Sequence, residues 1–171
     1  MDVEAALAAL EAAGAEETRR VYQRHGAPEP LFGVPPAELR ALAGTIGVDH
    51  DLAGALWATG NTDARCLAAL VADPARIDAA LADAWAADAR YYVLSDLLAE
   101  LIARSPLAIE RMSQWIASPD EWIGRAGWSV MGELARRHPD VPDAAFTPYL
   151  AIIERRIHDA PDRTREAMNE A

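Results

Sequence analysis

Helix-breaking residues interrupt this chain at short intervals, and the segments between them have the periodicity of amphipathic helices. Gly26 ends a first helical region, Pro36 begins a short helix that runs to Ile46, and Gly47 and Gly60 mark the next breaks. No segment shows the alternation of polar and apolar residues that a half-buried strand requires. The sequence therefore predicts an all-α fold of roughly nine or ten helices, each about 10 to 18 residues long, joined by short turns.

Later breaks share one pattern, in which a polar residue precedes a proline. Asp73-Pro74, Ser105-Pro106 and Ser118-Pro119 each place an N-cap residue before proline at the first helical position. Glu121 follows Ser118 by three residues and completes a capping box. These pairs predict three helix starts, and His138-Pro139 predicts the end of the helix that begins at Ser118.

Short connections between amphipathic helices place consecutive helices antiparallel to one another. A series of such pairs stacks into a right-handed α-superhelix, as HEAT-like repeats do. A compact helical bundle is the alternative, because the internal repeat is too degenerate to establish a period. We expect the 171 residues to form one domain.

Charge and composition restrict the class of protein and its partners. The net charge of −11 disfavours nucleic acid on average, although the 16 basic residues are all arginine, which makes forked contacts with phosphate. A general preference for arginine over lysine is the simpler explanation of this composition. No apolar run approaches the roughly 18 residues of a membrane span. Because Cys66 is the only cysteine and the four histidines are far apart, we expect no metal, no cofactor and a cytoplasmic location.

Two short stretches carry the candidate site. Tyr92 and Asp96 share a helix face at i, i+4, and Trp122 and Arg125 share one at i, i+3. Asp96 is either satisfied by an arginine or a helix N-terminus, or it is a partly desolvated carboxylate that stabilises positive charge. Arg125 is either a surface cation or a partner of Asp96, or it clamps a phosphate. The apolar stripes of both helices place Asp96 and Arg125 at edge or surface positions.

Tryptophan and arginine side chains supply the remaining candidates. The five tryptophans are predicted, as a set, to anchor the core, but Trp122 and Trp128 flank Arg125 and raise the alternative of an aromatic groove. Small arginine clusters, such as Arg163 with Arg165, are typical of solvated helix faces.

The order of four segments resembles the AlkD-like family of DNA alkylation repair proteins. Residues 22–26 (Tyr-Gln-Arg-His-Gly), followed by 31–34 (Leu-Phe-Gly-Val) and 39–43 (Leu-Arg-Ala-Leu-Ala), resemble the first segment of the family, and Leu56-Trp57 resembles its next helix. Tyr92-x-x-x-Asp96 resembles the aromatic-x-x-x-Asp signature, and residues 122–126 (Trp-Ile-Gly-Arg-Ala) resemble the Trp-x-x-Arg segment. The similarity runs from about residue 20 to the end of the sequence.

This resemblance implies an α-superhelix of HEAT-like repeats with a concave surface for duplex DNA. The active members of the family are glycosylases that hydrolyse the N-glycosidic bond of N3- or N7-alkylated purines without a metal or cofactor. By the resemblance, Asp96 is the catalytic carboxylate, Tyr92 its aromatic neighbour and Arg125 the clamp on the DNA backbone, with Trp122 and Trp128 as further DNA-binding residues. The implied partner is duplex DNA that contains alkylated bases.

Two other functions stay open, and so does the extent of the domain. The active relatives carry tryptophan at the position of Tyr92, so a non-catalytic binder of DNA structures with the same fold is one alternative. A scaffold that binds protein partners is the other, because helical repeats commonly present such a surface. Relatives continue with at least one more helix pair after the position of residue 171, so we expect a single domain that either is shortened or lacks that pair.

Overall fold

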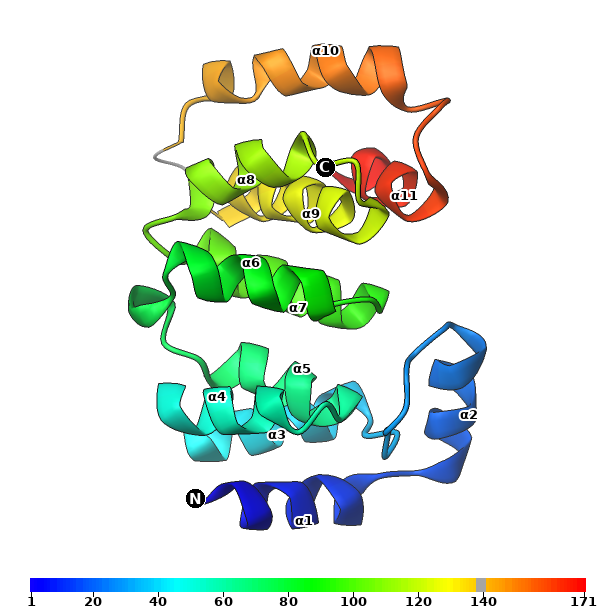
Figure 1. Ribbon diagram of the computed structural model, residues 1–171, viewed down its shortest axis with the longest axis vertical. Helices are drawn as coiled ribbons and strands as arrows, with labels where there is room; N and C mark the ends of the chain where they lie inside the picture. The colour runs from blue at the N-terminus through cyan, green and yellow to red at the C-terminus, as the bar shows by residue number, and fades with distance from the viewer. Residues whose placement is uncertain (138–140) are drawn as a thin grey trace. The chain divides into compact units, whose positions relative to one another are not determined.

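Eleven α-helices and two 3₁₀ helices make up the secondary structure of the computed structural model, which describes residues 1–137 and 141–171 (Figure 1). These ranges contain no strand, so the all-α prediction is confirmed, with slightly more helices than expected. None of the helices in the two ranges is long and apolar enough to cross a membrane. The chain forms two compact units, Met1–Arg76 and Ile77–Ala171, which are described separately.

In the first unit the helix α5 forms the centre. It contacts α1, α3 and α4, and eight of its ten residues are buried. Because helices surround it, its sequence lacks the single polar face of a surface helix. The elements of this unit are α1 (Val3–Ala13), α2 (Glu16–Arg24), α3 (Pro36–Ile46), α4 (His50–Ala58), α5 (Thr62–Val71) and the 3₁₀ helix η1 (Pro74–Arg76).

A buried carboxylate on α5 holds the extended segment that precedes α3. Asp63 is 3% exposed, and its oxygens accept hydrogen bonds from the backbone N–H groups of Phe32, Gly33 and Val34 at 2.7, 3.0 and 3.0 Å. A buried backbone N–H needs such a partner, since this extended segment has no strand beside it. The segment then leads into α3, which begins at Pro36 and ends before Gly47, as the sequence predicts.

In the second unit the long helix α9 forms the centre. It contacts α6, α7, α8 and α11, and ten of its residues are buried. In Figure 1, α8, α9 and α11 lie together, and α10, in orange, runs across the end of this unit. Its elements are α6 (Ala79–Asp88), α7 (Tyr92–Ala103), α8 (Ala108–Ile116), α9 (Glu121–Arg137), the 3₁₀ helix η2 (Asp143–Ala145), α10 (Thr147–Arg156) and α11 (Asp162–Glu170).

Glycine allows α8 and α9 to approach closely. A Cβ atom added to Gly127 would lie 2.5 Å from the backbone nitrogen of Ile116 and 2.8 Å from the carbonyl carbon of Trp115. Both distances are far shorter than a van der Waals contact, and both atoms belong to the backbone, which cannot move aside freely. Gly127 therefore sets the spacing of this helix pair.

The predicted helix starts at polar–proline pairs are wrong by a few residues. Asp73-Pro74 leads into η1, and the following helix α6 is capped by Asp78, whose carboxylate accepts from the Leu81 N–H at 2.8 Å. The hydroxyl of Ser105 accepts from the Leu107 N–H at 3.2 Å, and α8 begins only at Ala108. Pro106 belongs to a turn that precedes α8, and Pro74 is the first residue of the single-turn η1.

The start of α9 differs from the predicted capping box in the same way. Asp120 caps this helix, because its Oδ1 accepts from the backbone N–H groups of Trp122 and Ile123 at 2.9 and 3.1 Å. The hydroxyl of Ser118 accepts from the N–H of Asp120 instead, at 3.2 Å, and Glu121 bonds to another helix. The predicted helix end at 138–139 lies outside the described residues.

Candidate functional site

The candidate site is built on α7, α9 and α11. Tyr92 is the first residue of α7, and Asp96 follows it one turn later. Trp122 and Arg125 lie one turn apart at the start of α9, which packs against both α7 and α11. The packing of these three helices therefore brings together residues that are far apart in the sequence.

Arg125 is the buried centre of this site. Its Nη2 donates to both carboxylate oxygens of Asp96, at 2.9 and 3.0 Å, and its Nη1 donates to Oε2 of Glu166 at 2.9 Å and to the carbonyl of Arg163 at 3.4 Å. The side chain is 1% exposed. Its Nε is buried without a hydrogen-bond partner among the described residues. Arg125 thus joins all three helices through charge-assisted hydrogen bonds.

The sequence-based placement of Arg125 at a helix edge is wrong, whereas the prediction that the tryptophans as a set anchor the core is confirmed for Trp128. Both residues are buried, because α9 packs on α7 and α8 with one side and is covered by α11 on another. Trp128 is 1% exposed and makes a T-shaped contact with Tyr149, at 6.4 Å between ring centroids. Of the alternatives for Arg125, the structure contains the ion pair with Asp96; its contact with DNA stays a prediction.

Asp96 is half-exposed and is held on two sides. Besides the guanidinium of Arg125, the hydroxyl of Ser129 donates to its Oδ1 at 3.1 Å. Burial raises the pKa of Asp96 above its usual range, although Arg125 and Ser129 act in the opposite direction. The carboxylate borders a cavity of about 190 Å³, which is also lined by Glu100, Trp128, Ser129, Gly132, Glu133, Arg136, Ala167, Glu170 and Ala171.

Two aromatic rings at this site face arginine side chains. The guanidinium carbon of Arg163 lies over the rings of Tyr92 and Trp122, at 6.0 and 5.9 Å from their centroids. The guanidinium carbon of Arg125 also lies 6.0 Å from the centroid of Tyr92. These distances are those of cation–π contacts. The structure therefore brings together four of the predicted residues, Tyr92, Asp96, Trp122 and Arg125. Trp128 lies in the core, although it lines the same cavity as Asp96.

Sequence reasoning missed two members of the site, Arg163 and Glu166. Both lie on α11, about forty residues after Arg125, and no local spacing connects them with α9. Arg163 stands out in the sequence only as part of a small arginine cluster. The amphipathic pattern of α11 signals that one side of the helix is buried, but it does not say which helix it covers.

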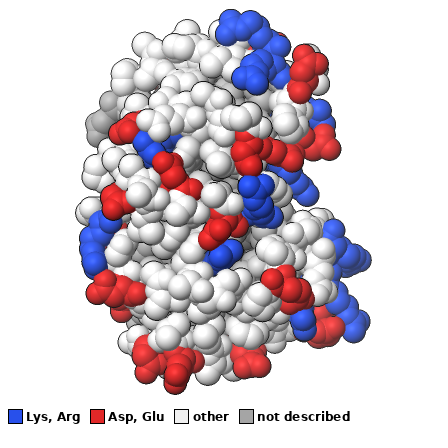
Figure 2. Space-filling model, viewed as in Figure 1, with Lys and Arg blue, Asp and Glu red and all other residues white. Residues whose placement is uncertain are grey.

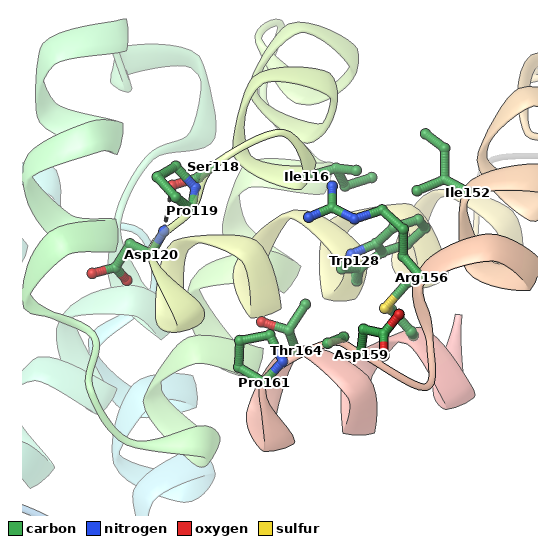
Figure 3. Close-up of a pocket in the computed structure, with 12 residues that line it drawn as sticks. Ile116, Ser118, Pro119, Asp120, Trp128, Ile152, Arg156, Asp159, Pro161 and Thr164 are labelled. Carbon is green, nitrogen blue, oxygen red and sulfur yellow. Dashed lines mark hydrogen bonds between the residues drawn. The ribbon is translucent and has the colours of Figure 1, made fainter.

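A second cavity lies on another side of α9, between the α8–α9 connection, α10 and α11 (Figure 3). Its volume is about 120 Å³, and Trp128 lines it as well as the cavity beside Asp96. Figure 3 shows the side chains of Arg156 and Ile152 from α10 and of Thr164 from α11 around this space. Apolar atoms form most of its wall, and none of the cation–aromatic contacts lies in it.

Basic side chains gather locally rather than over a whole face. Figure 2 shows blue arginine side chains over α2 and, separately, over α10 and α11, with red carboxylates among them. On α2, the exposed Arg20 pairs with Glu16 at 2.9 Å, whereas the exposed Arg24 has no ion-pair partner within residues 1–137 and 141–171. Positive potential available to an anion is therefore confined to small areas.

No metal centre or disulfide is formed by the part of the chain that the structure describes. It contains no group of three or more His, Cys, Asp or Glu residues that could hold a metal ion. Cys66 is a free, buried thiol, and burial raises its pKa.

Comparison with known proteins identifies the family of this chain. Residues 6–171 match the model of a family described as DNA alkylation repair enzyme. One solved structure, described as "a new family of proteins related to the HEAT-like repeat DNA glycosylases with affinity for branched DNA structures", has a TM-score of 0.92 and 36% sequence identity, covering 99% of this chain and 74% of that chain. The comparison with curated proteins found no match. The fold is therefore the predicted HEAT-like helical fold, and the chain belongs to the DNA alkylation repair enzyme family.

Proposed function

We propose that this protein binds branched DNA and does not excise alkylated bases. The observation that carries this proposal is the ion pair between Asp96 and Arg125, in which one guanidinium nitrogen donates to both carboxylate oxygens. The catalytic role implied for Asp96 requires a negative charge that stabilises a cation developing on the sugar. A carboxylate already neutralised by a buried arginine has little of that stabilisation left to give.

The aromatic part of the site supports the same proposal. A cationic alkylated base would be attracted to an aromatic face at this site. The ring of Tyr92 already faces the guanidinium groups of Arg125 and Arg163, each 6.0 Å from its centroid. Arg163 therefore already lies over the Tyr92 ring that a cationic base would need, and its guanidinium can instead bind an anionic phosphate.

Branched DNA as the ligand is supported by the relative of known structure. That protein is 36% identical to this chain and belongs to a family described as having affinity for branched DNA structures. A junction offers closely spaced phosphates and bases that are partly unstacked, and arginine and aromatic side chains bind both. With the net charge of −11, recognition must depend on local cations rather than on the whole surface.

Excision of alkylated purines is the second candidate, and one observation favours it. Asp96 is half-exposed and borders a cavity of about 190 Å³, so its carboxylate is accessible from that side. In this case Asp96 would keep the catalytic role implied by the resemblance, with water placed from the cavity.

One experiment separates these candidates. The protein is titrated into a fluorescent four-way junction and into a linear duplex of equal length, and in parallel it is incubated with methylated duplex DNA while released 3-methyladenine and 7-methylguanine are measured. We expect binding to the junction without release above background. Release by the wild type that is lost in Asp96→Asn would instead establish the glycosylase. Absence of binding to either DNA at low salt would contradict both and favour a scaffold for protein partners.

A cytoplasmic location accords with this proposal. DNA is the proposed ligand, and the single thiol Cys66 is buried and unpaired, which suits a reducing compartment.

A further inference from the structure

We infer that Arg163, which faces the rings of Tyr92 and Trp122, is the group that binds a DNA phosphate at this site, and that Arg125 acts only by positioning it. This inference rests on the proposed binding of branched DNA. It assigns the contact with the backbone to a residue on α11 that the sequence signature does not include.

Arg125 cannot serve as the phosphate contact in this structure. Its side chain is 1% exposed, and both of its terminal nitrogens donate to protein oxygens on α7 and α11. A phosphate would have to displace Asp96 or Glu166 and enter a space that is closed by helix packing. Either displacement would give up a charge-assisted hydrogen bond that the buried guanidinium already makes with a protein carboxylate.

Arg163 is accessible and has donors to spare. Its side chain is 36% exposed, and of its five N–H donors the structure assigns one nitrogen, Nη1, to Oε2 of Glu166 at 3.2 Å. The remaining guanidinium donors have no acceptor within the ranges 1–137 and 141–171. A half-exposed guanidinium with open donors is the group that a phosphate oxygen binds.

The backbone of Arg163 is fixed from two sides. Its N–H donates to Oε1 of Glu121 at 2.8 Å, and its carbonyl accepts from Nη1 of Arg125 at 3.4 Å. The hydroxyl of the next residue, Thr164, donates to the carbonyl of Glu121 at 2.9 Å. These bonds tie the start of α11 to the start of α9, so Arg125, together with Glu121, positions the backbone of Arg163.

The two rings then restrict the guanidinium itself. Its central carbon lies 6.0 Å from the ring centroid of Tyr92 and 5.9 Å from that of Trp122, and its donors lie in the guanidinium plane, which suits forked contacts with phosphate. Restricting the side chain beforehand reduces the entropy lost on binding. A lysine at this position would retain the charge but not the planar fork of donors.

Substitutions on α11 test this inference against a matched control. Binding of a fluorescent four-way junction is measured between about 50 and 200 mM salt for the wild type, Arg163→Gln, Arg163→Lys and Arg165→Gln. Arg165 lies on the same helix, is 41% exposed and pairs with Asp162. The substitution Arg165→Gln therefore removes the same charge from a position away from the two aromatic rings. Thermal melts of each variant serve as the control for folding.

We expect Arg163→Gln to weaken binding roughly tenfold and to reduce the slope of log K against log salt by about one. Arg163→Lys should keep the slope and lose part of the affinity, and Arg165→Gln should resemble the wild type. Equal effects of Arg163→Gln and Arg165→Gln, or an unchanged slope, would overturn the inference while leaving junction binding intact. If the wild type does not bind the junction, the proposed function itself fails, and this inference fails with it.

Discussion

One terminal nitrogen of Arg125 donates to both carboxylate oxygens of Asp96, at 2.9 and 3.0 Å, in a side chain that is 1% exposed. The two residues that the sequence signature marks as catalytic carboxylate and backbone clamp are therefore partners of each other. Because Arg125 also reaches Glu166, the pair connects α7, α9 and α11. We expect this ion pair to stabilise the packing of the three helices and also to set the charge of the site.

We first expect a measurable coupling between these two residues. Asp96→Asn, Arg125→Met and the double variant are unfolded in urea and compared with the wild type in a double-mutant cycle. Since Arg125 is buried, the coupling energy should be about 1–3 kcal/mol. The exposed pair Arg20–Glu16, at 2.9 Å on α2, serves as the control, and its coupling should stay below about 0.5 kcal/mol. Additive effects at Asp96 and Arg125 would contradict the structure.

A second expectation concerns Asp63, the buried acceptor of three backbone N–H groups. Asp63→Ala leaves these donors without a partner, which should lower the free energy of unfolding by about 2–3 kcal/mol or more. Asp51→Asn removes an exposed carboxylate whose one ion pair within residues 1–137 and 141–171 is with Arg76, and it should change stability by less than about 0.5 kcal/mol. Urea denaturation measures both, and a tolerated Asp63→Ala would refute the assigned role.

Two helix-interior glycines should respond to alanine with opposite signs. Gly127→Ala places a methyl group against the backbone of α8 and should destabilise the protein by about 1–3 kcal/mol. Gly54 lies inside α4, where an added Cβ would meet nothing within 4 Å. Gly54→Ala should therefore stabilise by about 0.5–1 kcal/mol, through helix propensity and a less flexible unfolded chain. Thermal melts of the two variants test this, and a gain in stability from Gly127→Ala would be inconsistent with the close approach.

The cap of α9 should make stability depend on pH. Burial acts against the charged form of Asp120, but the N–H groups of Ile123 and Trp122 and the guanidinium of Arg90 outweigh it and lower the pKa. A lowered pKa in the folded state means that this contribution is present above the usual pKa of aspartate, about 3.9, and is lost as the pH falls through the folded value.

Asp120→Asn isolates this effect, because asparagine also caps helices but does not titrate. The wild type should melt at a higher temperature than the variant near neutral pH, and the difference should shrink below about pH 4. Melting temperatures measured from about pH 7 to pH 3 provide the comparison. A difference that stays constant over this interval would argue against an ionised, stabilising Asp120.

The sequence predicts the helices better than the contacts between them. Periodicity and breakers gave the all-α fold, and Pro36 and Gly47 bound α3 as expected, because these signals act within a few residues. The polar–proline pairs predicted helix starts that are wrong by a few residues, because a proline that fits the first turn of a helix also fits a preceding turn. At α9 the structure uses Asp120, two residues after the predicted cap.

The site divides in the same way. The spacing predicts that Tyr92 and Asp96 share a face of α7 and that Trp122 and Arg125 share a face of α9. The structure brings the two pairs together. The burial of Arg125 could not be read from α9 alone, because it depends on α11 covering a second side of that helix. Arg163 and Glu166 enter the site for the same reason, through a tertiary contact that leaves no local pattern.

The most direct test of the proposed function is a competition measurement. A fluorescent four-way junction bound to the wild-type protein is displaced by unlabelled junction or by unlabelled linear duplex of the same length and composition, and anisotropy reports the two affinities at one salt concentration. If the protein recognises branched DNA, the unlabelled junction should compete at least roughly tenfold better, a difference of about 1.4 kcal/mol. Equal competition by the linear duplex would contradict the proposal.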